Sequence, residues 1–142
     1  MVTLQQLLDR KGHAIRSISP GEPVLEAVRM MAENHIGALL VMEQGKLLGI
    51  VSERDYARKI VLKGRSSAST PVREIMSSPV ATIAPDRGVE DAMREMTNGR
   101  FRHLPVVAGG QVVGVVSIGD LVKCVIDDQR DLIENLQQYI RG

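Results

Sequence analysis

Two short stretches of the sequence place a hydroxyl and a carboxylate at the same spacing. Residues 49–55 read GIVSERD and residues 114–120 read GVVSIGD, so that Ser52 and Asp55 recur as Ser117 and Asp120. A serine just before a helix accepts hydrogen bonds from backbone N–H groups, and an acid three residues later completes a capping box. The free N–H groups of the same first turn also attract phosphate. Each stretch is therefore either a helix cap alone or a cap that also binds an anionic ligand.

The two stretches belong to an internal duplication with a constant offset of 65 residues (120 − 55 = 65). Residues 17–55 and 82–120 align without a gap and share 13 identities in 39 positions. Upstream, TLQQLL at 3–8 resembles TPVREIM at 70–76, but out of register by about three residues. A repeat of this kind predicts two copies of one structural unit. The expected parts are a first domain with an N-terminal helix at 1–63, a polar linker at 64–70, a second domain at 71–126 and a C-terminal helical extension at 127–142.

Each copy shows the periodicities of a β-α-β-β-α unit. A short strand ends at residues 17–18 or 82–83, and a helix with apolar positions at helical spacing follows it. Two apolar runs then flank a glycine-containing turn, EQGK or AGGQ, as in a β-hairpin, and the serine of the motif opens a last helix. One copy is too small to bury both faces of its own sheet. We therefore expect an α/β (α+β) fold in which the two copies pack as a pair.

Composition excludes several classes of function. The chain has 142 residues, of which 25% are charged, with a net charge of +1 and 2% aromatic residues. Such a chain has neither the basic surface nor the stacking platforms of a nucleic-acid-binding protein. The N-terminus is too polar for a signal peptide and no apolar run could span a membrane. The single cysteine, Cys124, suits a reducing compartment, so we expect a cytoplasmic protein that binds neither nucleic acid nor membrane.

Catalytic and metal-binding patterns are weak. His103, Ser117 and Asp120 supply the residue types of a catalytic triad, but nothing presents the serine on a strained turn. The histidines His13, His35 and His103 lie far apart with no partner at ligand spacing, so no metal site is predicted. No Walker-type phosphate loop is present. We therefore predict a protein that is not an enzyme and has no catalytic residues.

The duplicated pattern, the run RHLPVV at 102–107 and the two Gly-x-x-Ser-x-x-Asp endings together resemble the tandem CBS (cystathionine-β-synthase) domain family. The resemblance implies a pseudo-two-fold pair with two clefts between the copies. It also implies binding of adenosine-containing ligands, such as AMP, ADP, ATP, S-adenosylmethionine or NAD(H), and no metal. The ligand-binding residues that it implies are Ser17, Ile18, Ile50, Ser52, Arg54, Asp55, Thr82, Ile83, Arg102, His103, Pro105, Val115, Ser117 and Asp120.

The residue types fit the implied roles. A helix start that carries serine and aspartate one turn apart can hold a phosphate on the hydroxyl and N–H groups. The carboxylate, an acceptor only, can take both hydroxyls of a ribose. Ile50 and Val115 would offer an apolar wall to the base, and the backbone at 17–18 and 82–83 would contact the adenine edge. Basic residues precede the second copy's strand at 102–103, where the first copy has glycine and alanine. Arg54, and after it Arg58 and Lys59, are the candidate replacements there.

The sequence thus predicts a stand-alone regulatory module that senses energy or redox state through an adenine nucleotide or NAD(H) and acts on an unidentified partner protein. The rival interpretation is a structural dimerisation module with empty clefts. Apolar stripes run along both ends of the chain, at Leu4, Leu7 and Leu8 and over residues 122–140. They predict a homodimer formed through helices, unless both stripes fold back on the chain's own core.

Overall fold

The computed structural model describes residues 1–141, which form two compact units. Unit 1 combines Met1–His13 with the chain from Thr82 onward, and unit 2 is Ala14–Ala81. This division differs from the boundaries expected from the sequence, which placed the N-terminal helix with the first repeat. Each unit instead joins one repeat to the segment that precedes the other repeat.

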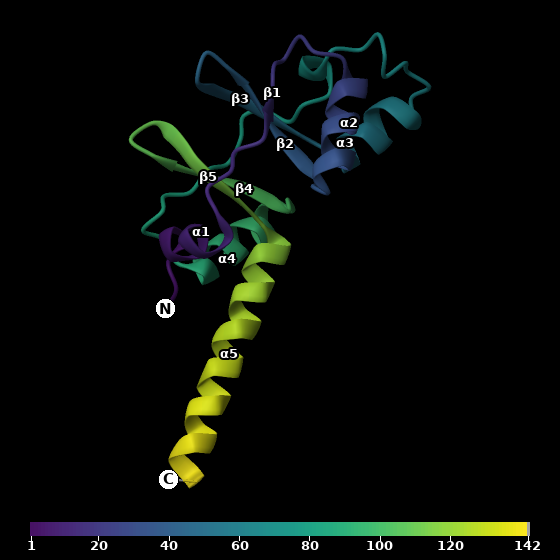
Figure 1. The fold of residues 1–142 in the computed structure, drawn as a ribbon. Coiled ribbons are helices and arrows are strands. Elements are labelled where there is room, and N and C mark those ends of the chain that lie inside the picture. The colour runs from purple at the N-terminus through teal and green to yellow at the C-terminus, as the bar shows by residue number, and fades with distance from the viewer. Residues whose placement is uncertain (142) are drawn as a thin grey trace. The chain divides into compact units, whose positions relative to one another are not determined.

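Unit 1 is a hairpin with helices packed on it (Figure 1). Its elements are α1 (Leu4–Lys11), α4 (Val89–Gly99), β4 (His103–Ala108), β5 (Gln111–Ser117) and α5 (Ile118–Arg141). Strands β4 and β5 are antiparallel and turn at Gly109 and Gly110, both at positive φ, where glycine avoids a steric penalty. The core gathers apolar side chains from every one of these elements: Leu4, Leu8, Val89, Ala92, Met96, Leu104, Val106, Val116 and Leu121.

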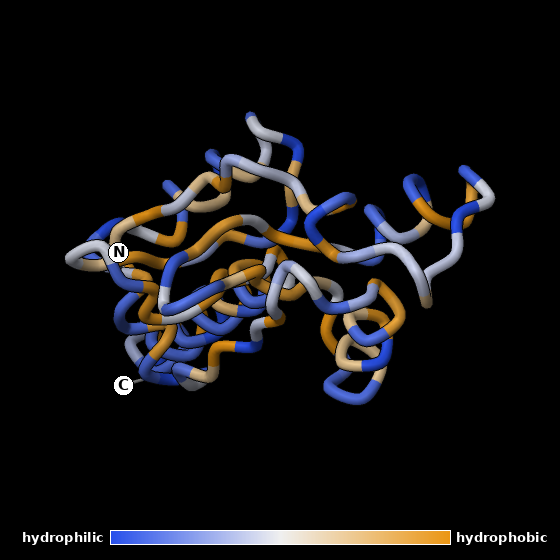
Figure 2. Tube along the Cα trace, turned by 90° about the horizontal axis from the view of Figure 1, so that it is seen from above, coloured by the Kyte–Doolittle hydropathy of each residue, from blue (hydrophilic) through white to orange (hydrophobic). Residues whose placement is uncertain are grey.

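Unit 2 contains the first repeat and a three-stranded sheet in the order β1-β2-β3. Strand β1 pairs parallel to β2, and β2 pairs antiparallel to β3. Its elements are β1 (Ser17–Ile18), α2 (Val24–Asn34), β2 (Ala38–Glu43), β3 (Lys46–Ser52), α3 (Glu53–Tyr56), a π-helical turn (Ala57–Val61) and a 3-10 turn (Val72–Glu74). The β-α-β-β-α order and the α+β class predicted from the sequence are confirmed. Orange and blue alternate along the helical coils in Figure 2, as amphipathic helices require.

One expected strand is reduced to a single bridge. Residues 82–83 were predicted to end a strand, but only Ile83 pairs, with Val106 of β4. In unit 2 the N–H of Leu40 donates to the carbonyl of Arg16 at 3.1 Å and extends the pairing of β1. The position 65 residues later is Pro105, which has no N–H to donate (40 + 65 = 105). Proline in β4 therefore explains why the second repeat has two strands where the first has three.

In both units the segment that precedes the other repeat binds at the same place, before the first long helix of the repeat. The N–H of Leu4 donates to the carbonyl of Arg87 at 2.9 Å, and the N–H of Val72 donates to the carbonyl of Glu22 at 2.8 Å. The donors are 68 residues apart (72 − 4 = 68) and the acceptors 65 (87 − 22 = 65), so the three-residue shift seen in the sequence is real.

Uncapped helix starts give a reason for this exchange. The residues preceding α2 and α4 are Pro23 and Gly88, and neither supplies a side-chain cap. The first helical N–H groups, of Val24 and Val89, donate instead to the carbonyls of Thr70 at 2.8 Å and Val2 at 3.0 Å. The preceding segment thus satisfies backbone donors that a helix start would otherwise leave unpaired.

The two apolar stripes expected at an interface have different surroundings. Leu4, Leu7 and Leu8 are at most 4% exposed and lie in the core of unit 1, so the prediction that α1 offers them to a second copy is wrong. Helix α5 begins in the same core, with Leu121 and Cys124 buried. It then extends away from the rest of its unit (Figure 1). The apolar side chains of that extension are exposed: Leu132, Ile133, Leu136, Tyr139 and Ile140.

Candidate functional site

The Ser117–Asp120 motif lies where β5 ends and α5 begins. The hydroxyl oxygen of Ser117 accepts from the N–H of Asp120 at 3.2 Å, and Asp120 Oδ2 accepts from the N–H of Ser117 at 2.8 Å. These reciprocal bonds are the capping box that the spacing predicts. The cap is therefore present, and what else contacts the carboxylate decides whether it can also bind a ligand.

Lys11, at the end of α1, contacts the same carboxylate. Its Nζ donates to Asp120 Oδ2 at 2.7 Å and to the carbonyl of Val115 at 2.8 Å. Burial raises the pKa of Asp120, but the hydrogen bonds from Lys11 and from the Ser117 backbone outweigh it and hold this pKa below its ordinary value. The two side chains keep 37% and 27% of their surface exposed. The second repeat thus presents a charged carboxylate beside an ammonium that solvent reaches.

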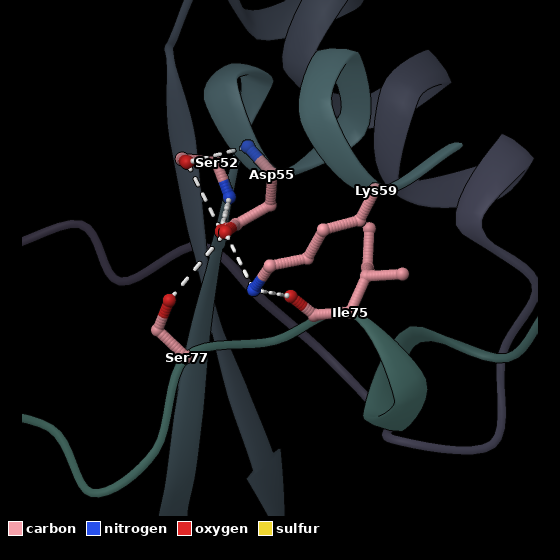
Figure 3. Close-up of polar contacts among 5 residues, drawn as sticks. All are labelled: Ser52, Asp55, Lys59, Ile75 and Ser77. Carbon is pink, nitrogen blue, oxygen red and sulfur yellow. Dashed lines mark hydrogen bonds and ion pairs between the residues drawn. The ribbon is translucent and has the colours of Figure 1, made fainter. Parts of the chain in front are cut away.

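The equivalent carboxylate of the first repeat, Asp55, is enclosed (Figure 3). Both the N–H and the hydroxyl of Ser52 donate to Asp55 Oδ2, at 2.9 and 3.0 Å. Lys59 Nζ lies 3.1 Å from Oδ1, and the Ser77 hydroxyl donates to that oxygen at 3.4 Å. The Asp55 side chain is 11% exposed. Donors from this unit therefore occupy both of its oxygens.

The chain segment beside each motif accounts for this difference. In unit 2 an extended segment follows Ile75, and Ser77 exchanges backbone hydrogen bonds with Ile50 at 2.8 and 3.1 Å. In unit 1 the corresponding segment stays helical through Lys11, and the lysine ammonium binds the carbonyl of Val115. A backbone edge covers the first motif, whereas side chains that follow or belong to α1, among them Leu8 beside Gly114 and Lys11 on Val115, cover the second.

The other residues predicted to bind a ligand lie partly near these motifs. In unit 1, His103 is opposite Ser117 in the hairpin register and the carbonyl of Arg102 accepts from the N–H of Ile118 at 2.8 Å. In unit 2, Arg54 is exposed on α3, directly before Asp55. The binding roles of all these residues stay predictions. Of the rest, Ser17, Thr82 and the Arg102 side chain are exposed, Ile50, Val115 and His103 are half-buried, and Ile18, Ile83 and Pro105 are buried.

Two lysines contact the motif aspartates in ways that were not predicted, since Lys59 was considered only for a phosphate and Lys11 was not considered. Lys59 follows Asp55 by one helical turn, and helical spacing could have identified that pair. Lys11 and Asp120 are 109 residues apart, and no local pattern connects them. Only the packing of α1 on the second repeat brings them together.

Nucleophilic or metal chemistry finds little support in the described residues. Cys124 is 7% exposed, and burial raises the pKa of its thiol, which disfavours the reactive thiolate. Within residues 1–141, no group of three or more His, Cys, Asp and Glu side chains is arranged to hold a metal ion. In the same residues, no helix combines the length and apolar character needed to cross a membrane.

Comparison with known proteins gives a consistent result. The model of the CBS domain family matches residues 13–62 and 72–127. The CBS domain-containing protein CBSX3, mitochondrial, of Arabidopsis thaliana is 42% identical over 126 residues, which cover 85% of this chain and 61% of that protein. This chain thus spans about three fifths of the length of that relative.

Solved structures agree with the family match. A CBS-domain protein from Burkholderia ambifaria MC40-6 is 47% identical with a TM-score of 0.88, over 90% of this chain and 96% of that one. The CBS domain pair of MJ0100, in complex with 5′-methylthioadenosine and S-adenosyl-L-methionine, has a TM-score of 0.78 at 23% identity, over 87% and 99% of the two chains. At that identity the likeness shows the fold alone.

Proposed function

The chain belongs to the CBS domain family, and from this membership we propose that it is a regulatory module that binds an adenosine-containing ligand at the Ser117–Asp120 motif. The observation that carries the proposal is the hydrogen bonding and exposure of the Asp120 carboxylate. Its hydrogen bonds from Lys11 and Ser117 both end on Oδ2, and its side chain is more exposed than that of Asp55. A charged, accessible acceptor at a helix start suits the hydroxyls of a ribose.

The neighbouring groups suit the rest of such a ligand. The N–H groups of Ile118 and Asp120 donate within the unit, to the Arg102 carbonyl and the Ser117 hydroxyl, so a phosphate would use the Gly119 N–H and the Ser117 hydroxyl at the start of α5. Val115 is half-buried on β5 and would contact the base. Arg102 and His103 adjoin Ser117 through the hairpin register and would add positive charge near the phosphate.

The proposed ligands are AMP, ADP or ATP, with NAD(H) as the redox alternative. Binding of one of these would let the protein report energy or redox state to a partner protein. The bound nucleosides of MJ0100 belong to that protein, and the ligand class proposed for this chain rests on its own motif. The cytoplasmic location also stays a prediction, since the Arabidopsis relative is named as mitochondrial.

Isothermal titration calorimetry with AMP tests the site through Asp120→Asn. The variant keeps the shape of the side chain and removes its charge. It is expected to weaken binding by about 1.5–3 kcal/mol, the usual contribution of hydrogen bonds to a charged group, or roughly tenfold to a hundredfold.

Asp91→Asn is the matched control. Asp91 also accepts from a backbone N–H at a helix start, at 3.1 Å, and pairs with Arg87 at 3.3 Å. Its side chain is 28% exposed, close to the 27% of Asp120. Equal affinity for AMP in both variants and the unaltered protein would contradict the proposed site.

A second candidate function, self-association through α5, rests on the exposed stripe of the helix extension. Ile126, Ile133 and Ile140 recur every seven residues, and Leu136 lies between the last two. Isoleucine at one core position of a heptad and leucine at the other favour a two-stranded coiled coil. The side chains of Ile133, Leu136 and Ile140 are 54%, 53% and 81% exposed. A homodimer would bury this surface against the same helix of a second copy.

Light scattering tests the homodimer at micromolar concentration. Twice the chain mass of 15.5 kDa is expected, and Leu136→Asp together with Ile133→Asp should return the monomer mass. A charge placed at buried positions of a coiled coil leaves an unpaired ion in an apolar seam. Monomer mass for the unaltered protein would refute self-association, and a dimer that survives both substitutions would place the interface elsewhere.

A further inference from the structure

Lys11 is the one cation that contacts the Asp120 carboxylate among the hydrogen bonds and ion pairs found in residues 1–141. Its Nζ lies 2.7 Å from Asp120 Oδ2 and 2.8 Å from the carbonyl oxygen of Val115. A lysine ammonium carries three donors, and these two bonds use two of them. The third donor and the 37% exposed side chain leave the ammonium accessible to an incoming ligand.

The corresponding lysine of the first repeat has a different origin, although its side chain is similarly exposed, at 43%. Lys59 comes from the same helical segment as Asp55, four residues away, and binds the carbonyl of Ile75 at 2.8 Å. The position of the second repeat equivalent to Lys59 is the buried Cys124 (59 + 65 = 124). In the segment that packs on the first repeat, the position equivalent to Lys11 is Pro79 (11 + 68 = 79). The two repeats thus reach an aspartate–lysine pair by unrelated routes, and the pairs differ in the exposure of the aspartate, whose side chain is 27% exposed in unit 1 and 11% exposed in unit 2.

From this arrangement we propose that Lys11 sets the charge selectivity of the Ser117–Asp120 site, so that it takes adenosine ligands with an anionic 5′ group in preference to neutral or cationic ones. The inference rests on the ligand site proposed above. A ribose that hydrogen-bonds to Asp120 competes with the ammonium for that carboxylate. The released ammonium then lies within a side chain's reach of the ligand's 5′ end, at the helix start of α5.

The charges around this position favour an anion over a cation there. The α1 helix ends in Lys11, and the backbone carbonyl of Arg102 accepts from the N–H of Ile118 across the hairpin, whereas Arg10 is paired with Asp128 at 3.9 Å. The first-turn N–H groups of α5 add the positive end of a 24-residue helix. A phosphate gains charge-assisted hydrogen bonds in this place, whereas the sulfonium of S-adenosylmethionine would meet an ammonium of like charge.

Calorimetric titration with AMP, 5′-methylthioadenosine and S-adenosylmethionine tests the proposal. All three share the adenosine moiety and differ in the charge of the 5′ group. The unaltered protein is expected to bind AMP most tightly. Lys11→Met should reduce the ratio of the 5′-methylthioadenosine dissociation constant to that of AMP by roughly tenfold or more, the usual effect of a lost charged hydrogen bond. Lys11→Arg, which keeps the positive charge, should retain most of the ratio.

Lys123→Met is the matched control, because it removes the same charge from an exposed position of α5 in the same unit. Helix α1 should remain in place in every variant, since Leu4, Leu7 and Leu8 anchor it in the core, and the thermal unfolding temperature checks this. The AMP preference of the unaltered protein should also decline as salt is added.

The outcomes separate this inference from the proposed site. An unchanged ratio in Lys11→Met, while Asp120→Asn weakens AMP binding, would overturn the role of Lys11 alone. Tighter binding of S-adenosylmethionine than of AMP by the unaltered protein would overturn it as well. Failure of the unaltered protein to bind any of the three ligands would overturn both.

Discussion

The two copies of the Gly-x-x-Ser-x-x-Asp motif share a sequence and a capping box, yet their aspartates have different surroundings. Asp55 accepts donors from Ser52, Lys59 and Ser77 on both oxygens and is 11% exposed. Asp120 binds Ser117 and Lys11 through Oδ2 and is 27% exposed. A motif match therefore identifies a helix start, whereas the segment packed beside it decides whether the carboxylate is committed to the fold or accessible to a ligand.

The largest expected effect is on stability, when a buried residue is truncated in the segment that each repeat receives from before the other repeat. Leu4 and Val72 occupy equivalent places in the two exchanged segments, and both are fully buried. Leu4→Ala should lower the free energy of unfolding by about 2–5 kcal/mol, because it leaves a cavity in the core of unit 1. Val72→Ala should lower it by less, since fewer atoms are removed.

Urea denaturation followed by circular dichroism measures both variants. Leu62→Ala is the control, because that side chain is 77% exposed and its truncation should change stability by less than about 0.5 kcal/mol. A loss in Leu4→Ala no greater than in the control would show that α1 does not belong to the core of the second repeat.

The glycine that opens each motif gives a sharper comparison. A Cβ at Gly49 would lie 2.7 Å from the Met76 sulfur and 2.9 Å from the backbone carbonyl oxygen of Ser77, whereas the atoms nearest to a Cβ at Gly114 all belong to the Leu8 side chain, the first at 2.6 Å. A leucine can change rotamer, but a paired backbone cannot move without breaking its hydrogen bonds. Gly49→Ala should therefore cost about 1–3 kcal/mol of stability and Gly114→Ala less. Equal losses in thermal unfolding would mean that the two covering segments are equally rigid.

The aspartates should differ in what their loss affects. Asp55→Asn should lower the free energy of unfolding by about 1–3 kcal/mol, because Ser52, Lys59 and Ser77 lose a charged acceptor at a side chain that is only 11% exposed. Asp120→Asn should cost less stability and act mainly on ligand affinity. Denaturant unfolding of the two variants, each compared with its own AMP titration, measures the difference. Asp120→Asn as the more destabilising variant would reverse the assignment of structural and binding roles.

The smallest expected effect is a pH dependence of unit 1. Because the folded-state pKa of Asp120 is depressed, its ionised form contributes stability above the unfolded-state pKa, and this contribution is lost as the pH falls through the lower folded value. Lys11→Met removes the main partner that depresses this pKa, so the pKa should rise and the acid-side loss should become smaller. A carboxyl NMR titration of both proteins measures the shift. The same pKa in both would show that Lys11 does not bind Asp120 in solution.

Much of the fold followed from the sequence because it depends on local patterns. Apolar residues at helical spacing predicted α2 and α4, and the turns at Gly45 and Gly110 predicted two hairpins. The serines at 52 and 117 predicted the helix starts, and the family resemblance was confirmed by the match to two CBS domains. The sequence also explains why residues 82–83 form only an isolated bridge. Pro105, in the neighbouring strand, has no backbone N–H to donate.

The sequence by itself determined the repeat, the order of elements and the capped Ser–Asp pair, since each depends on residues within a few positions of one another. Tertiary structure alone decided which segment covers which repeat, and hence that Lys11 contacts Asp120 across 109 residues while Ser77 encloses Asp55. It also decided that the leucines of α1 are core residues and those of the α5 extension are surface residues, although both stripes have the same helical spacing. Periodicity reports that a face is apolar, but the surface that buries it is supplied by chain far away in sequence.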